Sequence, residues 1–134
     1  MKKLTLTILI LIGLSTITFA QSSFQMPLGT FSGSGEIAGG KHTIKLVNSL
    51  GNSLLTYGGA TKCTTILSET SNAGLFEETD MWDGKTGKVS KNSCQEKGFV
   101  FLVKTKTGLI YHWGATKEEA MGKTAPVSLK KTKN

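Results

Sequence analysis

The fold can be predicted mainly from residues 57–113, which read YGGATKCTTILSETSNAGLFEETDMWDGKTGKVSKNSCQEKGFVFLVKTKTGLIYHW. It contains the only two cysteines of the chain, Cys63 and Cys94, and short runs rich in strand-forming residues lie on either side of each. Thiols pair in an oxidising compartment, and two cysteines allow only one connectivity. The stretch therefore predicts one sheet pinned by a Cys63–Cys94 disulfide.

A redox-active pair or a zinc site is the alternative use of two cysteines. Redox pairs usually have the close C-x-x-C spacing that lowers a thiol pKa, and these two cysteines lie far apart. His42 and His112 have no ligand-like spacing that could complete a zinc site. We predict a structural disulfide, no metal site and no cofactor.

The N-terminus has the three parts of a signal peptide. Met1-Lys2-Lys3 is positively charged, the run 4–14 is almost entirely apolar, and Thr18-Phe19-Ala20 places small residues where signal peptidase reads them. The apolar run is roughly half the ~20 residues that a spanning helix needs. We therefore expect cleavage before Gln21, which removes residues 1–20. The remaining chain has no later apolar run long enough to span a membrane, so we expect it to be exported to the periplasm or the medium.

The rest of the chain has the length of a single domain. We expect residues 21–27 to lead into an antiparallel β-domain over residues 28–129, and residues 130–134 to form a basic, frayed tail. Glycine-rich turns separate runs of alternating apolar and polar residues, and Thr116 begins the one helical candidate, which stops at Gly122. The expected strands are 28–36, 42–47, 53–57, 63–69, 75–82, 98–103, 109–113 and 127–129, with a helix over 116–121.

About eight short strands with hairpin spacing predict an all-β fold, either a closed antiparallel meander barrel or a small sandwich. A barrel is favoured because closure removes exposed strand edges. It also explains glycines such as Gly33 and Gly35, which let a strand bend or let a neighbour approach closely. The strand order is left open.

Several short motifs occur in a familiar order, and the chain resembles a family of small exported bacterial β-domains of unknown function. The resemblance implies a β-domain over most of the mature chain and carries over no activity. The motifs are Gly29-x-Phe31-x-Gly33-x-Gly35, Leu55-Thr56-Tyr57, Cys63, Phe76-x-Glu78, Cys94 with Gly98, Leu109-x-Tyr111-x-Trp113 and Ala120-x-Gly122.

Three carboxylates lie close together in Glu77, Glu78 and Asp80, and a carboxylate pair could serve acid–base chemistry or glycoside hydrolysis. Alternation puts Glu78 and Asp80 on one face with Phe76 and Trp82. Nothing nearby completes a catalytic site, so we expect solvated charges on a sheet face, and one carboxylate could be hydrogen-bonded inside the barrel.

Histidine and glycine provide no catalytic site either. Histidine can serve as a base near neutrality, but alternation points His112 away from Tyr111 and Trp113, and no nucleophile or metal partner stands beside it. Gly33 and Gly35 do not form a phosphate loop, because no helix start or lysine-serine pair follows. We predict no catalytic residue and no enzyme activity.

The chain is basic, with sixteen lysines, nine acidic residues and a formal net charge of +7. Such a surface suits an acidic protein or an anionic envelope component, although scattered lysines also suit a plainly solvated surface. The lysines are not interleaved with aromatic residues, so nucleic acid is not an expected partner. The oligomeric state is left open.

Two functions remain. The first is an exported, non-catalytic binding module that captures a protein or an envelope component, and the alternative is a carrier of small apolar ligands in a lipocalin-like barrel pocket. The residues expected to contact a ligand or partner are Phe76, Glu78, Phe99, Phe101, Tyr111 and Trp113.

Overall fold

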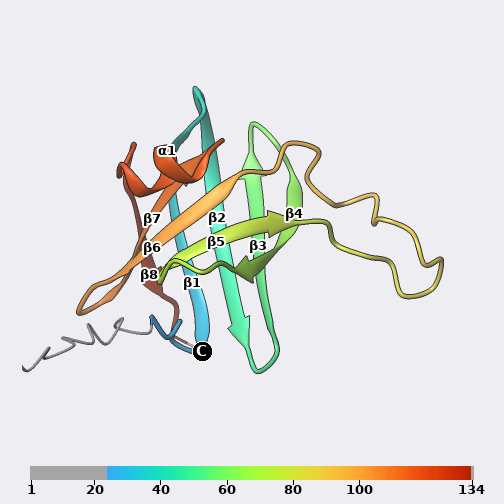
Figure 1. The fold of residues 1–134 in the computed structure, drawn as a ribbon, viewed down its shortest axis with the longest axis horizontal. Coiled ribbons are helices and arrows are strands. Elements are labelled where there is room, and N and C mark those ends of the chain that lie inside the picture. The colour runs from blue at the N-terminus through green and yellow to red at the C-terminus, as the bar shows by residue number, and fades with distance from the viewer. Residues whose placement is uncertain (1–23, 134) are drawn as a thin grey trace, which may run out of the picture.

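The computed structural model describes residues 24–133, so the expected signal peptide lies outside the described residues. Eight antiparallel strands close into a barrel, with one short helix before the last strand (Figure 1). The predicted all-β meander barrel is confirmed, and the sandwich is excluded. The elements are β1 (Gly29–Ile37), β2 (Gly40–Ser49), β3 (Asn52–Gly59), β4 (Cys63–Glu69), β5 (Leu75–Thr79), β6 (Phe99–Lys104), β7 (Gly108–Gly114), α1 (Lys117–Met121) and β8 (Val127–Lys131).

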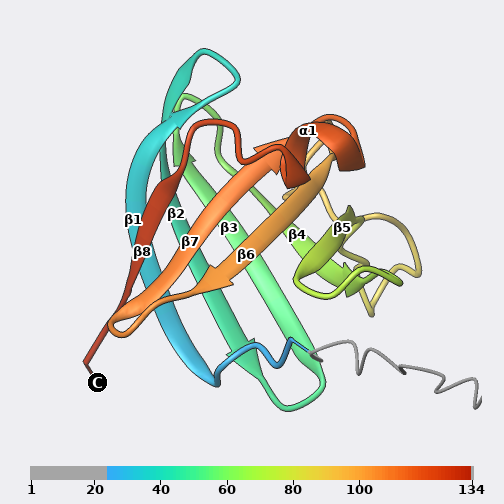
Figure 2. The same cartoon turned by 60° about the vertical axis from the view of Figure 1, so that its left-hand side comes forward.

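Each strand pairs with the next one in sequence, and β8 returns to β1 to close the ring (Figure 2). Side chains alternate between the two faces, so that Ile44 and Leu46 of β2 are buried while Lys45 between them is exposed. The inward side chains of all eight strands meet in one apolar core. Its members include Phe31, Leu46, Leu55, Leu67, Phe76, Val100, Leu102, Leu109, Tyr111 and Leu129.

Two inward glycines of β1 make the closure possible. A Cβ atom at Gly33 would lie 2.2 Å from the carbonyl oxygen of Ser128, and one at Gly35 would lie 2.5 Å from a methyl carbon of Val127. Both contacts are shorter than real atoms allow. The absence of side chains at Gly33 and Gly35 therefore lets β8 cross closely over β1.

The pairing of β8 with β1 also shows that the frayed tail predicted for residues 130–134 begins too early. Lys130 and Lys131 do not fray: they belong to β8 and pair with Ser32 and Phe31 of β1. The pairing uses backbone groups, and both lysine side chains stay exposed, so their charge does not oppose it. The β-domain extends past residue 129 for this reason.

The segment before β1, residues 24–27, packs at the end of the barrel near the β2–β3 turn. Phe24 and Met26 pack against the core, and the ring of Phe24 meets that of Phe76 edge-on at 5.9 Å between centroids. The side-chain amide of Asn48 donates to the carbonyl oxygens of Met26 and Pro27 at 2.9 and 3.1 Å. Residues 24–27 thus pack over part of this end and do more than lead into β1, and a cavity of about 570 Å³ remains between them, the β2–β3 turn and β4.

The fifth strand ends earlier than the sequence predicted. It stops at Thr79, and the chain then leaves the barrel in a long excursion that returns at Gly98 (Figure 1). Trp82 consequently does not share a barrel face with Glu78, and it forms an isolated antiparallel bridge with Val89. We call residues 81–91, the outer part of this excursion, the ribbon.

The predicted disulfide is confirmed and holds the excursion to the barrel. Cys63 and Cys94 are bonded, with 4.8 Å between their Cα atoms. Thr64 of β4 adds two backbone bonds, donating to Asn92 at 2.7 Å and accepting from Cys94 at 3.2 Å. The returning limb is therefore fixed against β4.

The expected helix is present as α1. The Thr116 hydroxyl accepts from the backbone N–H of Glu119 at 3.2 Å, as an N-cap does, and the helix ends at Gly122. Within residues 24–133, no helix has the length and apolar character needed to cross a bilayer.

Replacing Cys63 with Ser should lower the free energy of unfolding by about 3–4 kcal/mol, because the open loop regains conformational entropy in the unfolded chain. Urea denaturation of the oxidised protein and the variant measures the difference. Unchanged unfolding midpoints would mean that the disulfide does not constrain the fold.

Gly33→Ala should destabilise the protein by about 1–3 kcal/mol or more, because the new methyl group meets the backbone of β8. Gly84→Ala in the ribbon is the matched control, since a Cβ there meets nothing within 4 Å. Thermal unfolding compares the two variants. Equal melting temperatures would contradict the close approach at the seam.

Candidate functional site

A buried carboxylate lies at the centre of the polar interior. Glu78 of β5 is only 4% exposed and accepts three hydrogen bonds. Its Oε1 accepts from the Tyr57 hydroxyl, and its Oε2 accepts from the backbone N–H of Gly98 at 3.0 Å and from the indole N–H of Trp113 at 3.2 Å. Both carboxylate oxygens are therefore occupied by donors of the protein itself.

The hydrogen bonds continue from Glu78 to a second tyrosine. The hydroxyl oxygens of Tyr57 and Tyr111 lie 2.6 Å apart. Because the Tyr57 proton goes to Glu78, Tyr111 donates to Tyr57. The three side chains come from β3, β5 and β7, so this chain of bonds crosses the interior of the barrel.

The environment raises the pKa of both tyrosines well above the usual value of 10.0. Burial is the largest cause for Tyr57, and the neighbouring Tyr111 and Glu78 add to it. Burial also dominates the rise in the pKa of Tyr111, followed by the Glu78 carboxylate, while the hydrogen bond with Tyr57 opposes it. Both hydroxyls therefore stay protonated as donors.

A cavity of about 640 Å³ opens at the end of the barrel opposite the β2–β3 turn, which we call the mouth. The β1–β2 and β3–β4 turns stand at its rim, at the top of Figure 1. Tyr57 and Trp113, the two aromatic partners of Glu78, line it together with the Cys63–Cys94 disulfide. The mouth is thus built on side chains that the buried network holds in place.

The rim of the mouth carries charge of both signs. Lys62 and Lys91 line the cavity with Glu96 as the one acidic residue. His42 also lines it, with its ring 6.2 Å from that of Tyr57 and its Nδ1 2.8 Å from the carbonyl oxygen of Gly40. The cavity at the mouth is therefore lined by the aromatic rings of Tyr57 and Trp113, which we call its floor, and by a rim with more basic than acidic residues.

The structure brings four of the six expected contact residues together inside the barrel. Phe76, Glu78, Tyr111 and Trp113 all point inward, although only Trp113 reaches the cavity. Of the two carboxylates that alternation placed on the face of Phe76, Glu78 is buried inside the barrel, whereas Asp80 lies beyond the end of β5.

Phe99 and Phe101 do not join the other four, and their assignment to a barrel pocket is corrected. Val100 and Leu102 take the inward positions of β6, so both phenylalanines lie on the outer face. Phe101 packs beside His112, at 6.3 Å between ring centroids, and the Lys117 ammonium lies 5.8 Å from the centre of the Phe99 ring. Each phenylalanine therefore packs against a side chain on the outside of the barrel and does not line its interior.

The other titratable candidates form no second site. Glu77 is exposed on the outer face of β5. Asp80 forms an ion pair with Lys97 at 2.7 Å, and the hydrogen bond from Lys97 is the main reason that the pKa of Asp80 is lowered. His112 is buried on the outer face, with its Nδ1 3.0 Å from the carbonyl oxygen of Thr124. In the part of the chain that the structure describes, no three His, Cys, Asp or Glu side chains gather as a metal site.

Sequence reasoning missed three contributors to the site. Tyr57 was recognised as part of a strand, and its alternation with buried Leu55 could have placed it inside. Gly98 must lack a side chain, because a Cβ there would lie 2.8 Å from the Trp113 ring. His42 precedes the inward Ile44 by two residues, which puts it on the inward side.

Comparisons of the chain with models of protein families, with curated proteins and with solved structures find no match. The site is therefore interpreted from its own geometry.

Glu78→Ala should lower the free energy of unfolding by about 3 kcal/mol or more, since two buried donors and the partly buried indole N–H of Trp113 lose their acceptor. Glu77→Ala, which alters the exposed neighbour, should change it by about 0.5 kcal/mol at most. Urea denaturation of both variants gives the comparison. A similar small effect of both substitutions would show that the network does not stabilise the fold.

Stability should fall at alkaline pH. The unfolded chain loses its tyrosine protons near pH 10 while the folded chain retains them, so stability is complete below that pH and declines above it, by about 1.4 kcal/mol per pH unit for each tyrosine. The chain has only two tyrosines, so phenolate absorbance reports them alone. It should rise together with the loss of circular dichroism.

Tyr111→Phe is the control for this titration, because it removes one phenol and keeps the Tyr57–Glu78 bond. Its stability should decline less steeply with pH than that of the wild type. Phenolate formation near pH 10 in a protein that is still folded would contradict the raised pKa values.

Proposed function

We propose that the chain is an exported, non-catalytic binding module that receives a protruding segment of a protein partner at the mouth of its barrel. The observation that carries this proposal is the mouth cavity of about 640 Å³. Its volume falls in the range of natural binding pockets, roughly 300–1,000 Å³. Its floor is fixed in advance by the bonds of Glu78, which reduces the entropy lost on binding.

The filled interior favours a partner at the mouth over an apolar ligand within the barrel. Leu55, Val100 and Leu102 are buried at the centre, and Phe24 and Met26 pack against the core at the opposite end, where they line a separate cavity of about 570 Å³. An eight-stranded barrel has room either for its own side chains or for one small ligand. A long apolar ligand would have to displace this core, so the carrier function is not proposed.

The saturated hydrogen bonding of Glu78 supports a non-catalytic role. A general acid or base must reach a proton of the substrate, and both oxygens of Glu78 already accept bonds from the protein. The hydroxyls of Tyr57 and Tyr111 are likewise engaged with each other. The network serves to orient the floor of the mouth.

Two observations support export and one indicates the chemistry of the partner. The first 20 residues have the pattern of a signal peptide, and the Cys63–Cys94 disulfide suits an oxidising compartment. The basic rim at Lys62 and Lys91 fits a segment that carries a carboxylate. We therefore expect the partner to insert an acidic loop or terminus.

Site-specific photo-cross-linking in the native cells tests this proposal. A photoreactive residue at Thr61, on the rim of the mouth, should yield a defined protein adduct. The same residue at Leu50, which is 90% exposed on the β2–β3 turn, should not. Reversal of charge by Lys62→Glu with Lys91→Glu should abolish the adduct, whereas Lys41→Glu with Lys45→Glu on the outer face of β2 should leave it intact.

Failure to cross-link from Thr61, or equal adducts from Thr61 and Leu50, would refute partner binding at the mouth. An adduct that survives the reversal of Lys62 and Lys91 would refute the acidic segment. Circular dichroism of each variant confirms that it is folded.

A further inference from the structure

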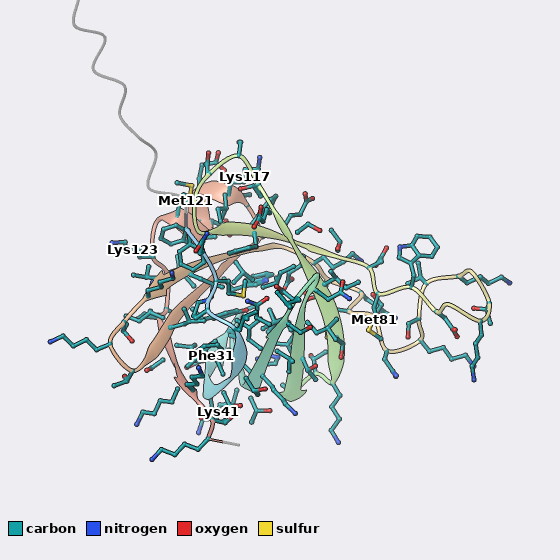
Figure 3. The ribbon with its side chains drawn as sticks, turned by 90° about the horizontal axis from the view of Figure 1, so that it is seen from below. Phe31, Lys41, Met81, Lys117, Met121 and Lys123 are labelled. Atoms are coloured by element: carbon teal, nitrogen blue, oxygen red, sulfur yellow. A yellow bond between two sulfur atoms is a disulfide. The ribbon has the colours of Figure 1, made fainter. Side chains whose placement is uncertain are left out.

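The ribbon, residues 81–91, projects away from the barrel, and Figure 3 shows Met81 on the limb that leaves it. Its own hydrogen bonds keep its two limbs together. Asp83 donates from its backbone N–H to Lys88 at 2.8 Å, and Ser90 donates in the same way to Met81 at 2.7 Å. The ribbon is therefore an ordered projection.

The base of the ribbon is also fixed. The backbone N–H of Met81 donates to the Ser93 hydroxyl at 3.1 Å, and the Asp80–Lys97 ion pair joins the outgoing limb to the returning one. The disulfide at Cys94 then holds the returning limb to β4. Whatever the ribbon binds is consequently held at a set position relative to the barrel.

Two apolar side chains stand exposed on this projection. Trp82 is 63% exposed and Val89 is 44% exposed, and the bridge between them places them opposite each other. Directly opposed residues of an antiparallel pair point to the same side. The ribbon thus presents one small apolar face to its surroundings.

Positive charge accompanies this face. Lys85, Lys88 and Lys91 are all exposed. The single carboxylate of the ribbon, Asp83, is turned back on the chain, where its Oδ1 accepts from the backbone N–H of Lys85 at 2.9 Å. The ribbon therefore offers a tryptophan beside a surplus of lysine.

This combination matches the surface of an anionic bilayer. The amphipathic ring of tryptophan prefers the interface between headgroups and acyl chains. Each lysine near an anionic lipid surface adds about 1 kcal/mol of attraction. A stable protein interface buries roughly 800 Å² on each partner, and a narrow ribbon with one apolar pair is small for that purpose.

We propose that the ribbon docks the protein reversibly on anionic phospholipid bilayers. Trp82 and Val89 enter the interfacial layer, and Lys85 and Lys88 contact the headgroups. The residues of this docking surface lie outside the cavity at the mouth, because neither Trp82 nor Lys85 nor Lys88 lines it; Lys91, at the inner end of the ribbon, lines the cavity and takes no part in the proposed docking. The proposal stands independently of any partner that binds there.

Vesicle co-sedimentation tests the proposal. The oxidised protein should bind vesicles that contain equal parts of phosphatidylglycerol and phosphatidylcholine, bind pure phosphatidylcholine weakly, and dissociate as salt is added. Trp82→Ala should weaken partition about tenfold or more. Lys85→Gln with Lys88→Gln should weaken it about 20- to 30-fold at low salt.

Matched substitutions elsewhere separate ribbon docking from general attraction. Leu50→Ala removes another highly exposed apolar side chain, at the opposite end of the barrel, and Lys41→Gln with Lys45→Gln removes two exposed lysines of β2. Neither should lower partition as strongly as the corresponding ribbon variant. All the substituted positions are exposed, so thermal unfolding should show that every variant folds.

Fluorescence gives a second readout. The chain has two tryptophans, so Trp82→Phe leaves only Trp113. Vesicles should shift the emission of the wild type to shorter wavelength and leave that of Trp82→Phe unchanged. Three results would each overturn the proposal: no binding to the anionic vesicles, equal binding to pure phosphatidylcholine, or binding that Trp82→Ala does not weaken.

Discussion

The hydrogen-bonded burial of Glu78 is the constraint on which the interior depends. A carboxylate taken out of water costs several kcal/mol unless donors surround it. Here the donors come from β3, from the residue that precedes β6, and from β7, while Glu78 itself belongs to β5. The four segments must keep their relative positions for these bonds to persist, and β5 and β6 share only a short ladder, Leu75 to Glu77 against Phe99 to Phe101. The network therefore reinforces the barrel where its backbone pairing is short.

The same hydrogen bonds fix the side chains that line the cavity at the mouth. The Tyr57 hydroxyl and the Trp113 indole N–H donate to Glu78, and both rings line the cavity. The disulfide lies beside them and also fixes the root of the ribbon. One set of constraints thus positions two surfaces of different chemistry, a concave mouth with aromatic and basic residues and a projecting apolar edge flanked by lysines. Rigid support of this kind favours binding, because little order has to be created when a partner arrives.

Local patterns predicted most of the strands because alternation and turns depend on neighbours in sequence, and the disulfide was predictable because two cysteines allow only one pairing. The alternation of Ile44 and Leu46 gave the inward face of β2. The run from Phe99 to Val103 is apolar at every position, so no alternation could show which side chains face inward. Lys130 and Lys131 looked like tail residues because strand closure uses backbone groups that composition does not reveal.

The candidate site was harder to predict than the fold. Tyr57 lies 21 residues from Glu78 and 54 from Tyr111, so their contact depends on barrel closure and register. Alternation along β5 continues through Asp80 to Trp82, and nothing local signals that the chain leaves the barrel after Thr79. The sequence allowed for a carboxylate that is hydrogen-bonded inside the barrel, but the donors around Glu78 could not be identified without the whole ring of strands.

Native mass spectrometry of the oxidised protein, isolated gently from the envelope and medium fractions of its own cells, distinguishes a protein segment bound at the mouth from a ligand carried in the barrel. We expect a complex of the chain with a second protein, and dissociation of that complex by Lys62→Glu with Lys91→Glu. A chain that carries a small apolar molecule, with no protein bound, would refute partner binding at the mouth.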